Sequence, residues 1–163
     1  MEFGTVDFKS DSMEFNFTDY YFKAMGGPLF RLFVSFERLI DPGEIAGFKV
    51  LTNALEQRTA ALSGEKRTLN IDPGYVSATA YILATSKNYA HRIYLGHGVF
   101  AQQELLFGKK KIQTLDWTYP DYRSIEYQEI FKKIRSAYLS QLKMQMNRNF
   151  PAGEVSKIIQ ESS

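Results

Sequence analysis

HRIYLGHGVFAQQELLFGKKKIQTLDW, residues 91–117, contains three runs of β-favouring residues separated by two glycine turns. The turns are Gly-His-Gly at 96–98 and Gly-Lys-Lys at 108–110. Runs of this length with tight turns between them are typical of consecutive antiparallel strands. The stretch therefore predicts a meander of three strands, which places an antiparallel sheet at the centre of the fold.

Further strands are predicted upstream from apolar and polar alternation. TVDFKSDSMEFNF at 5–17 alternates on both sides of a Lys-Ser-Asp-Ser turn, which predicts two short strands. PLFRLFVSFERLI at 28–40 is rich in Phe and Leu and predicts one strand, and KRTLNID at 66–72 predicts a short one.

Two helices are predicted from their capping residues. Asp41 has the features of an N-cap, with proline at the next position, Glu44 three residues after the cap, and Gly64 beyond the helix end. Ser124 is the predicted N-cap of a long helix that runs to Met146. Both segments carry apolar residues at helical spacing, so each is expected to bury one side.

The Asp-Pro-Gly sequence recurs at 72–74 and leads into YVSATAYILATSKN. The repeat predicts that Asp72 caps a further helix. Alternation in VSATAYILA allows a strand in its place. Both alternatives stay open at this point.

Strands in runs, with helices interspersed and no regular alternation, are typical of the α+β class. We expect an antiparallel sheet of about five to six strands with two to three helices packed on one face. Residues 1–147 are expected to form a single globular domain, and residues 148–163 a C-terminal tail or short helix.

Composition excludes several classes of site. The chain has no cysteine, which rules out disulfides, thiolate catalysis and thiolate-bound metals. Its longest apolar runs are far shorter than the ~20 residues that span a bilayer, and the N-terminus lacks the pattern of a signal peptide. We therefore expect a cytoplasmic protein with no membrane contact.

Five sequence blocks occur in a recognisable order: FNFTDYY, VSFERLIDPGE, LNIDPGY, HRIYLGHGVFAQ and WTYPDYRSIEY. With them the chain resembles an uncharacterised prokaryotic family catalogued as domain of unknown function 4416, from Phe3 to about Leu142. The family has no established catalytic residues, so the resemblance implies relatives and no mechanism. Some members carry the label "GTP-binding protein", but this chain has neither a G-x-x-x-x-G-K-[ST] loop nor an Asn-Lys-x-Asp sequence.

One departure from the family pattern concerns the N-terminus. Family members usually begin with a further strand and helix ahead of the segment that matches FGTVDF at 3–8, and here Met1 lies only two residues before it. A missing strand would expose a sheet edge, and exposed edges pair with other chains. A homodimer, or another protein partner bound through that edge, is a second hypothesis for the function.

The leading hypothesis is a binding domain for a small anionic ligand, phosphate-bearing or nucleotide-like. Cations and polar aromatic rings would hold such a ligand. The expected binding residues come from the meander and the loop that follows it: Lys87, His91, Arg92, Trp117, Tyr119, Asp121, Tyr122 and Arg123. No cofactor is indicated by any motif.

A third hypothesis is a hydrolase or transferase in which His91 acts as the base. Histidine titrates near neutrality, and a carboxylate from Asp72 or Glu104 would orient it. The same acids could join His91 and His97 around a metal, but the H-x-H and H-x-x-x-H spacings are absent, so no metal site is expected.

A nucleic-acid interface would need exposed rings beside a basic face. Trp117, Tyr119 and Tyr122 could supply rings near the lysines at 109–111. The pI of about 8.7 is below the strongly basic range of such domains, so nucleic acid is not the expected partner.

Overall fold

The computed structural model describes residues 3–17, 25, 28–64 and 67–149. The prediction of a tail over 148–163 lies outside these residues beyond position 149. No helix in the described ranges is both long enough and apolar enough to cross a membrane.

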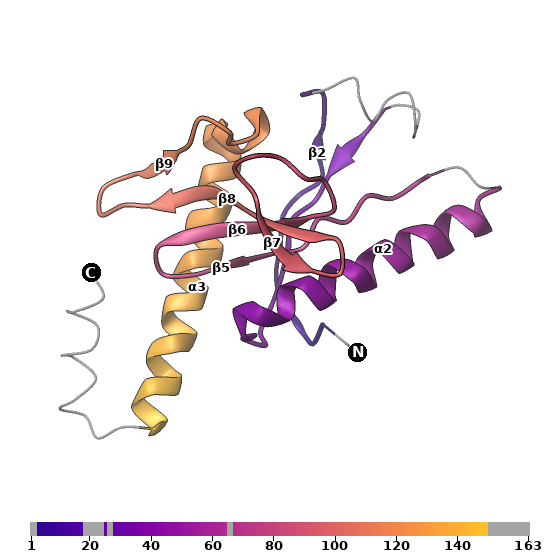
Figure 1. The fold of residues 1–163 in the computed structure, drawn as a ribbon. Coiled ribbons are helices and arrows are strands. Elements are labelled where there is room, and N and C mark those ends of the chain that lie inside the picture. The colour runs from indigo at the N-terminus through magenta and orange to yellow at the C-terminus, as the bar shows by residue number, and fades with distance from the viewer. Residues whose placement is uncertain (1–2, 18–24, 26–27, 65–66, 150–163) are drawn as a thin grey trace.

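The central sheet has five antiparallel strands (Figure 1). β6 (Ala80–Thr85) and β8 (Val99–Phe107) pair at its centre, and β5 (Gly74–Val76) pairs with the other edge of β6. β7 (Ile93–Gly96) pairs with the first part of β8, and β9 (Ile112–Thr114) pairs with its last part. The predicted meander is confirmed, because β7, β8 and β9 follow one another along the chain.

Helix α2 (Ile45–Leu62) begins with the predicted capping box. A short 3-10 turn precedes the helix, and the Asp41 carboxylate accepts a hydrogen bond from the backbone N–H of Gly43 at 2.7 Å. The Glu44 carboxylate accepts the backbone N–H of Asp41 at 3.0 Å. These two bonds satisfy donors that the start of a helix leaves open.

Helix α3 (Ile125–Asn149) begins where the sequence predicts. The Ser124 hydroxyl accepts the backbone N–H of Tyr127 at 3.2 Å, which is the predicted N-cap contact. A 3-10 turn over Pro120–Arg123 comes directly before it. This turn places Asp121 and Tyr122 in the interior, where both are buried.

The second Asp-Pro-Gly sequence opens strand β5, so the helix prediction there is wrong and the strand alternative is correct. A Cβ atom at Gly74 would lie 2.5 Å from Cε2 of Tyr81 and 2.6 Å from the carbonyl oxygen of Ile82. Only glycine permits so close an approach of two strands. The Asp72 carboxylate accepts hydrogen bonds from Lys49 and Asn70 and does not act as a helix cap.

The N-terminal strands form a separate antiparallel ribbon. β1 (Val6–Lys9) pairs with β4 (Val34–Phe36), and β2 (Met13–Glu14) pairs with β3 (Phe30–Arg31). The two strands predicted over 5–17 are confirmed. The prediction of a single strand over 28–40 is wrong, because the segment forms two short strands. Between them the Ser10 hydroxyl accepts a hydrogen bond from the backbone N–H of Phe33 at 3.0 Å.

The strand predicted over 66–72 is absent from its described part, residues 67–72. Polar groups of α2 bind this backbone in place of a neighbouring strand. The Glu56 carboxylate accepts the N–H of Ile71 at 2.7 Å, and the Lys49 ammonium donates to the carbonyl of Ile71 at 2.8 Å. Buried backbone groups need partners, and here a helix supplies them.

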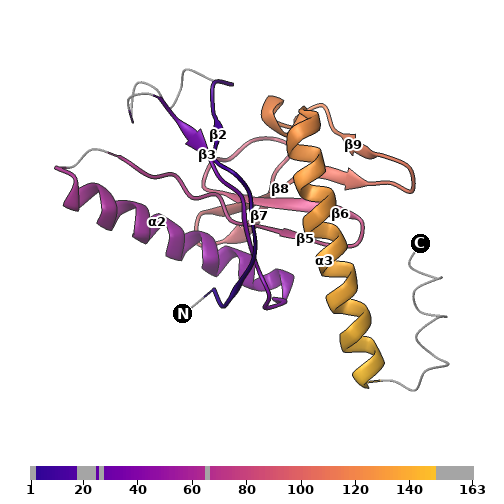
Figure 2. The same ribbon diagram turned by 180° about the vertical axis from the view of Figure 1, so that it is seen from behind.

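The ribbon lies between α2 and α3 (Figure 2). Along β6 the side chains alternate between two core clusters: Tyr81 and Leu83 pack with α3, and Ala84 packs with the start of α2. Successive residues of a strand point to opposite faces. The helices therefore pack against different faces of β6, whereas the sequence predicted helices on one face. The fold class is α+β, as predicted.

Candidate functional site

A cavity of about 720 Å³ lies among the ribbon, the two helices and residues 68–77. Ligand pockets commonly have volumes of roughly 300 to 1,000 Å³ and mostly apolar walls with a few polar groups. The walls here fit that description. Their apolar and aromatic members include Phe33, Ile45, Phe48, Leu69, Ile71, Tyr75 and Phe131. The cavity is the candidate functional site.

Arg31 of β3 brings a positive charge into the cavity wall. Its Nη1 lies 2.8 Å from Oδ2 of Asp121, and the Arg31 and Asp121 side chains are 19% and 5% exposed. Burial opposes the charge of Arg31, but the acidic groups around it, the Asp121 carboxylate among them, outweigh burial and raise its pKa. Arg31 therefore stays charged in surroundings that contain little water.

Two tyrosine hydroxyls lie in the same wall. The hydroxyl oxygens of Tyr81 and Tyr122 are 3.5 Å apart, and both residues line the cavity. Burial raises the pKa of both phenols. They are neutral at physiological pH and can each donate or accept a hydrogen bond.

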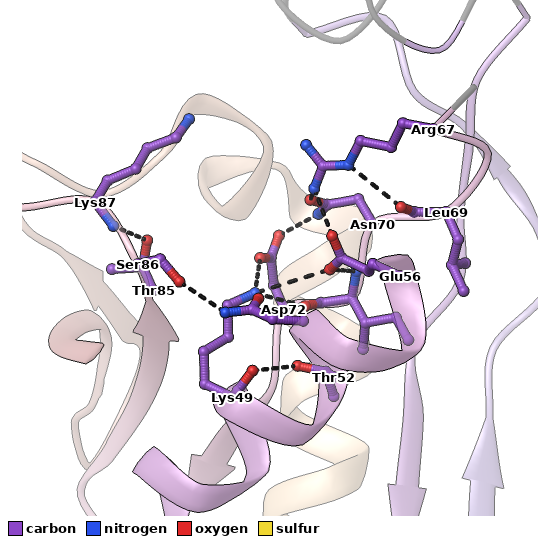
Figure 3. Close-up of polar contacts among 12 residues, drawn as sticks. Lys49, Thr52, Glu56, Arg67, Leu69, Asn70, Asp72, Thr85, Ser86 and Lys87 are labelled. Carbon is purple, nitrogen blue, oxygen red and sulfur yellow. Dashed lines mark hydrogen bonds and ion pairs between the residues drawn. The ribbon is translucent and has the colours of Figure 1, made fainter. Parts of the chain in front are cut away.

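Asp72 is one of two acids described in the cavity wall, with Asp7, and its contacts are drawn in Figure 3. Its Oδ1 lies 3.3 Å from the Lys49 ammonium, and its Oδ2 accepts the side-chain amide of Asn70 at 2.6 Å. The Asp72 side chain is 29% exposed, whereas that of Lys49 is only 6% exposed. Lys49 and Asn70 therefore fix the Asp72 carboxylate in place, and part of its surface stays exposed.

A second ion pair supports this arrangement from the chain segment before Asp72. Arg67 donates to Glu56 at 2.8 Å and also binds the side-chain oxygen of Asn70. Lys49 lies 3.9 Å from Glu56. The cluster of Lys49, Glu56, Arg67, Asn70 and Asp72, here called the lysine cluster, ties residues 67–72 to α2 (Figure 3).

The family of this chain is shown by a match to a protein-family model. The model of the family described as "Domain of unknown function (DUF4416)" matches residues 1–138. The chain belongs to the DUF4416 family. No curated protein and no solved structure matches it. The family membership expected from the sequence is thereby confirmed. Because the family has no known function, the function is argued from the geometry of this DUF4416 domain.

A buried polar network, none of whose residues lines the cavity, is centred on strand β8 of the DUF4416 domain. Glu104 is the extra residue where Leu105 and Gln103 pair with successive residues of β6, which makes a β-bulge. The Glu104 side chain binds Gln102 and accepts the backbone N–H of Tyr119 at 3.1 Å. Burial raises the pKa of Glu104 to about 7. The residue has no exposed surface, so it cannot touch a ligand in this conformation.

Arg92, which the sequence predicted as a ligand-binding cation, is a buried member of that network. Its guanidinium donates to Gln102 at 2.5 Å, to the Lys87 carbonyl at 2.6 Å and to the Tyr119 hydroxyl at 2.6 Å. The residue is 9% exposed. These contacts give Arg92 a role in joining the 87–92 loop to Tyr119.

His91 and Trp117 lie together at the surface. His91 Nε2 is 3.0 Å from Oε1 of Gln102, and the imidazole stacks on Trp117 with ring centroids 5.1 Å apart. Trp117 is 38% exposed and donates its Nε1–H to the carbonyl of Gln103 at 2.8 Å. Neither His91 nor Trp117 is part of the cavity wall.

The remaining predicted residues divide between the loop and the core. Arg123 donates to the carbonyls of Leu115, Asp116 and Thr118, each at 3.0 Å, so it stabilises the loop. Tyr122 is buried in the cavity wall, and Asp121 is paired with Arg31. The Lys87 side chain does not point toward Asp72 (Figure 3).

The proposed acid partners of His91 lie in different places. Gln102 stands between His91 and Glu104, and Asp72 belongs to the lysine cluster. Within the described residues, no group of three histidines or acids is placed to hold a metal ion.

Arg31, Lys49 and Tyr81 were missed as site residues. Arg31 is the single cation inside the apolar run PLFRLFVSF, and Lys49 lies on the helical stripe that starts at Ile45. A lone charge in an apolar pattern indicates either an ion pair or a site. The lone charges in these two apolar patterns could therefore have identified Arg31 and Lys49.

Proposed function

We propose that this protein binds a small, mostly apolar molecule that carries one acidic group, and that it does so in the cavity. The proposal rests on one observation: a guanidinium, that of Arg31, is set in the wall of an otherwise largely apolar cavity of about 720 Å³. An arginine in such surroundings is suited to a carboxylate or phosphate, because its planar group offers paired donors and stays charged.

The contacts of Arg31 leave room for a ligand. Asp121 contacts Nη1, and among the described residues no other hydrogen-bond acceptor contacts the guanidinium. The ring of Phe15 lies 4.4 Å from its Cζ atom and covers it with apolar surface. Five N–H groups are available on an arginine, so an acid can bind without displacing Asp121.

The other polar groups favour one orientation of the ligand. The hydroxyls of Tyr81 and Tyr122 can donate to an acid at the Arg31 end. Asp72 repels an acid at its own end of the wall, and its charge also acts on Arg31. The other described cation of the wall, Arg38, is half exposed and already paired with Glu44 at 2.8 Å. One buried cation among apolar walls suits one acidic group better than a chain of phosphates.

The proposed ligand is still anionic, as expected from the sequence, but the proposed site is the cavity and not the region around His91. Of the residues predicted to bind it, Tyr122 lines the cavity and Asp121 contacts Arg31. The Lys87, His91 and Trp117 group lies outside the cavity wall.

Two fluorescent probes test the proposal. 8-Anilinonaphthalene-1-sulfonate carries an acid on an aromatic body, and N-phenyl-1-naphthylamine has a similar body without the acid. We expect both to bind, and the Arg31→Met, Asp121→Asn double variant to bind the sulfonate at least about tenfold more weakly, since a hydrogen bond to a charged group contributes about 1.5 to 3 kcal/mol. The neutral probe should bind the double variant as tightly as it binds the unaltered protein.

Arg58→Met is the control, because Arg58 is exposed on α2 and absent from the cavity wall. It removes an arginine and should change neither affinity. Equal sulfonate binding by the double variant and the unaltered protein, or no binding of either probe, would refute the proposal.

A second candidate, self-association through a sheet edge, is supported by β7. This edge strand carries Ile93, 70% exposed, and Tyr94, 61% exposed. We propose antiparallel pairing of β7 with β7 of a second copy, because neither residue is charged and charge is what usually protects an edge. A dimer mass in light scattering that reverts to a monomer mass in Ile93→Lys would support it, and a monomer at all concentrations would refute it.

A further inference from the structure

His91 is held in one tautomer by its neighbours. Arg92 Nε lies 2.5 Å from the Gln102 atom that also faces His91, and arginine has no acceptor, so that atom is the amide oxygen. The Gln102 nitrogen then faces Glu104 and the Trp117 carbonyl, both of which are acceptors. His91 Nε2, 3.0 Å from the same oxygen, must carry the hydrogen. The neutral imidazole therefore has its lone pair on Nδ1.

The plane of the imidazole is fixed as well. Trp117 stacks on it at 10° and Tyr89 at 17°, with ring centroids 5.1 and 6.1 Å from that of His91. Stacked rings leave the edge of the imidazole as the route of approach. Nδ1 makes no hydrogen bond to any described residue and is not buried, so it lies on that open edge.

The positive charge close to the His91 ring favours an anionic reactant. The Arg92 guanidinium binds the same Gln102 oxygen as His91, so a permanent positive charge lies next to the ring. Lys87 belongs to the same exposed loop. The nearest acid of the network, Glu104, has no exposed surface and cannot repel a ligand at close range.

We propose that His91 is a nucleophile that accepts a phosphoryl group on Nδ1 from a small phosphorylated donor. The Nδ1 lone pair forms the N–P bond as the bond from phosphorus to the leaving group breaks. The leaving group departs with that electron pair and takes a proton from water. Nε2–H stays bound to Gln102 throughout, and the positive charge of the buried Arg92 guanidinium, which binds the same Gln102 oxygen, offsets part of the charge of the phosphoryl group from a distance. This site is separate from the cavity and does not depend on its ligand.

Phosphoramidate tests the proposal directly, because it transfers its phosphoryl group to histidine nitrogen and releases ammonia. The chain has only two histidines, and His97 is an internal control: it is exposed on the β7–β8 turn, and none of the described residues makes a hydrogen bond that fixes its tautomer. Phosphorus NMR of the treated protein distinguishes Nδ1 from Nε2 products. We expect His91 to give the Nδ1 product alone and to react before His97, which should give both isomers.

Three variants complete the experiment. His91→Ala should lose the early Nδ1 product, and His97→Ala should keep it. Gln102→Met removes the acceptor that fixes the tautomer, so a folded Gln102→Met protein should give both isomers at His91. The result in the unaltered protein decides the matter even if Gln102→Met does not fold. An Nε2 product at His91, or a reaction no faster than that of His97, would overturn the proposal.

Discussion

Nη1 of Arg31 lies 2.8 Å from Oδ2 of Asp121, and this ion pair joins the N-terminal ribbon to the turn before α3. Both residues are largely out of water, with side chains 19% and 5% exposed. Removing one partner of such a pair leaves the other charge buried without compensation, whereas removing both avoids that cost.

The first prediction follows from this asymmetry. Asp121→Asn leaves Arg31 without its counter-ion and should lower the free energy of unfolding by about 3 kcal/mol. Arg31→Met with Asp121→Asn should recover most of the loss. Urea unfolding of the single and double variants measures both values. A double variant that loses as much as the sum of the two single variants would show that the pair does not couple.

A second prediction concerns pH and Glu104, whose pKa is raised from 4.5 to about 7 by burial. The folded protein then holds this proton more tightly than the unfolded chain does. The stabilisation from Glu104 is therefore fully present below about pH 4.5 and is lost as pH rises through about 7, an effect on the order of 3 kcal/mol.

Glu104→Gln isolates this effect, because glutamine cannot ionise. The difference in unfolding free energy between the unaltered protein and Glu104→Gln should change steadily between about pH 5 and pH 7 and level off above that, with the unaltered protein losing stability faster as pH rises. Urea titrations at several pH values give the difference. If it is constant over that range, the Glu104 carboxyl does not titrate there.

The third prediction tests the lysine cluster. Lys49→Met leaves Asp72, Glu56 and the Ile71 carbonyl without the ammonium that lies 3.3, 3.9 and 2.8 Å from them. We expect a loss of about 3 kcal/mol in unfolding free energy. Lys133→Met, at an exposed position of α3, is the matched control and should stay within about 0.5 kcal/mol. Equal stability of the two variants would mean that the lysine cluster does not hold residues 67–72.

The local elements could be predicted where short-range chemistry determines them. Asp41 is followed by Glu44 in the capping-box position, and both predicted bonds are present. Asp72 is followed at that position by Tyr75, which cannot complete a capping box. The residue three positions after the aspartate, Glu44 or Tyr75, therefore distinguishes the helix start at 41 from the strand start that follows 72. The shared Asp-Pro-Gly does not by itself start a helix.

The cavity could not be predicted from such patterns, because distant segments build it. Arg31, Asp72 and Tyr122 come together only when the ribbon, residues 67–72 and the turn before α3 have packed. No local periodicity encodes those contacts. Arg92 and Trp117 did come together with His91, since the turn before β7 and the loop after β9 both contact β8 at Gln102 and Gln103.

The last prediction uses two glycines of opposite character. A Cβ at Gly74 would lie 2.5 Å from the Tyr81 ring and 2.6 Å from a backbone oxygen, whereas a Cβ at Gly47 of α2 would meet nothing within 4 Å. Gly74→Ala should lower the unfolding free energy by about 1 to 3 kcal/mol through overpacking between β5 and β6. Gly47→Ala should raise it by about 0.5 to 1 kcal/mol, because alanine is the better helix former. Thermal unfolding of both variants checks the signs. If residues 73–88 formed the helix first expected, Gly74→Ala would be neutral or stabilising, so its sign separates the two folds of the second Asp-Pro-Gly segment.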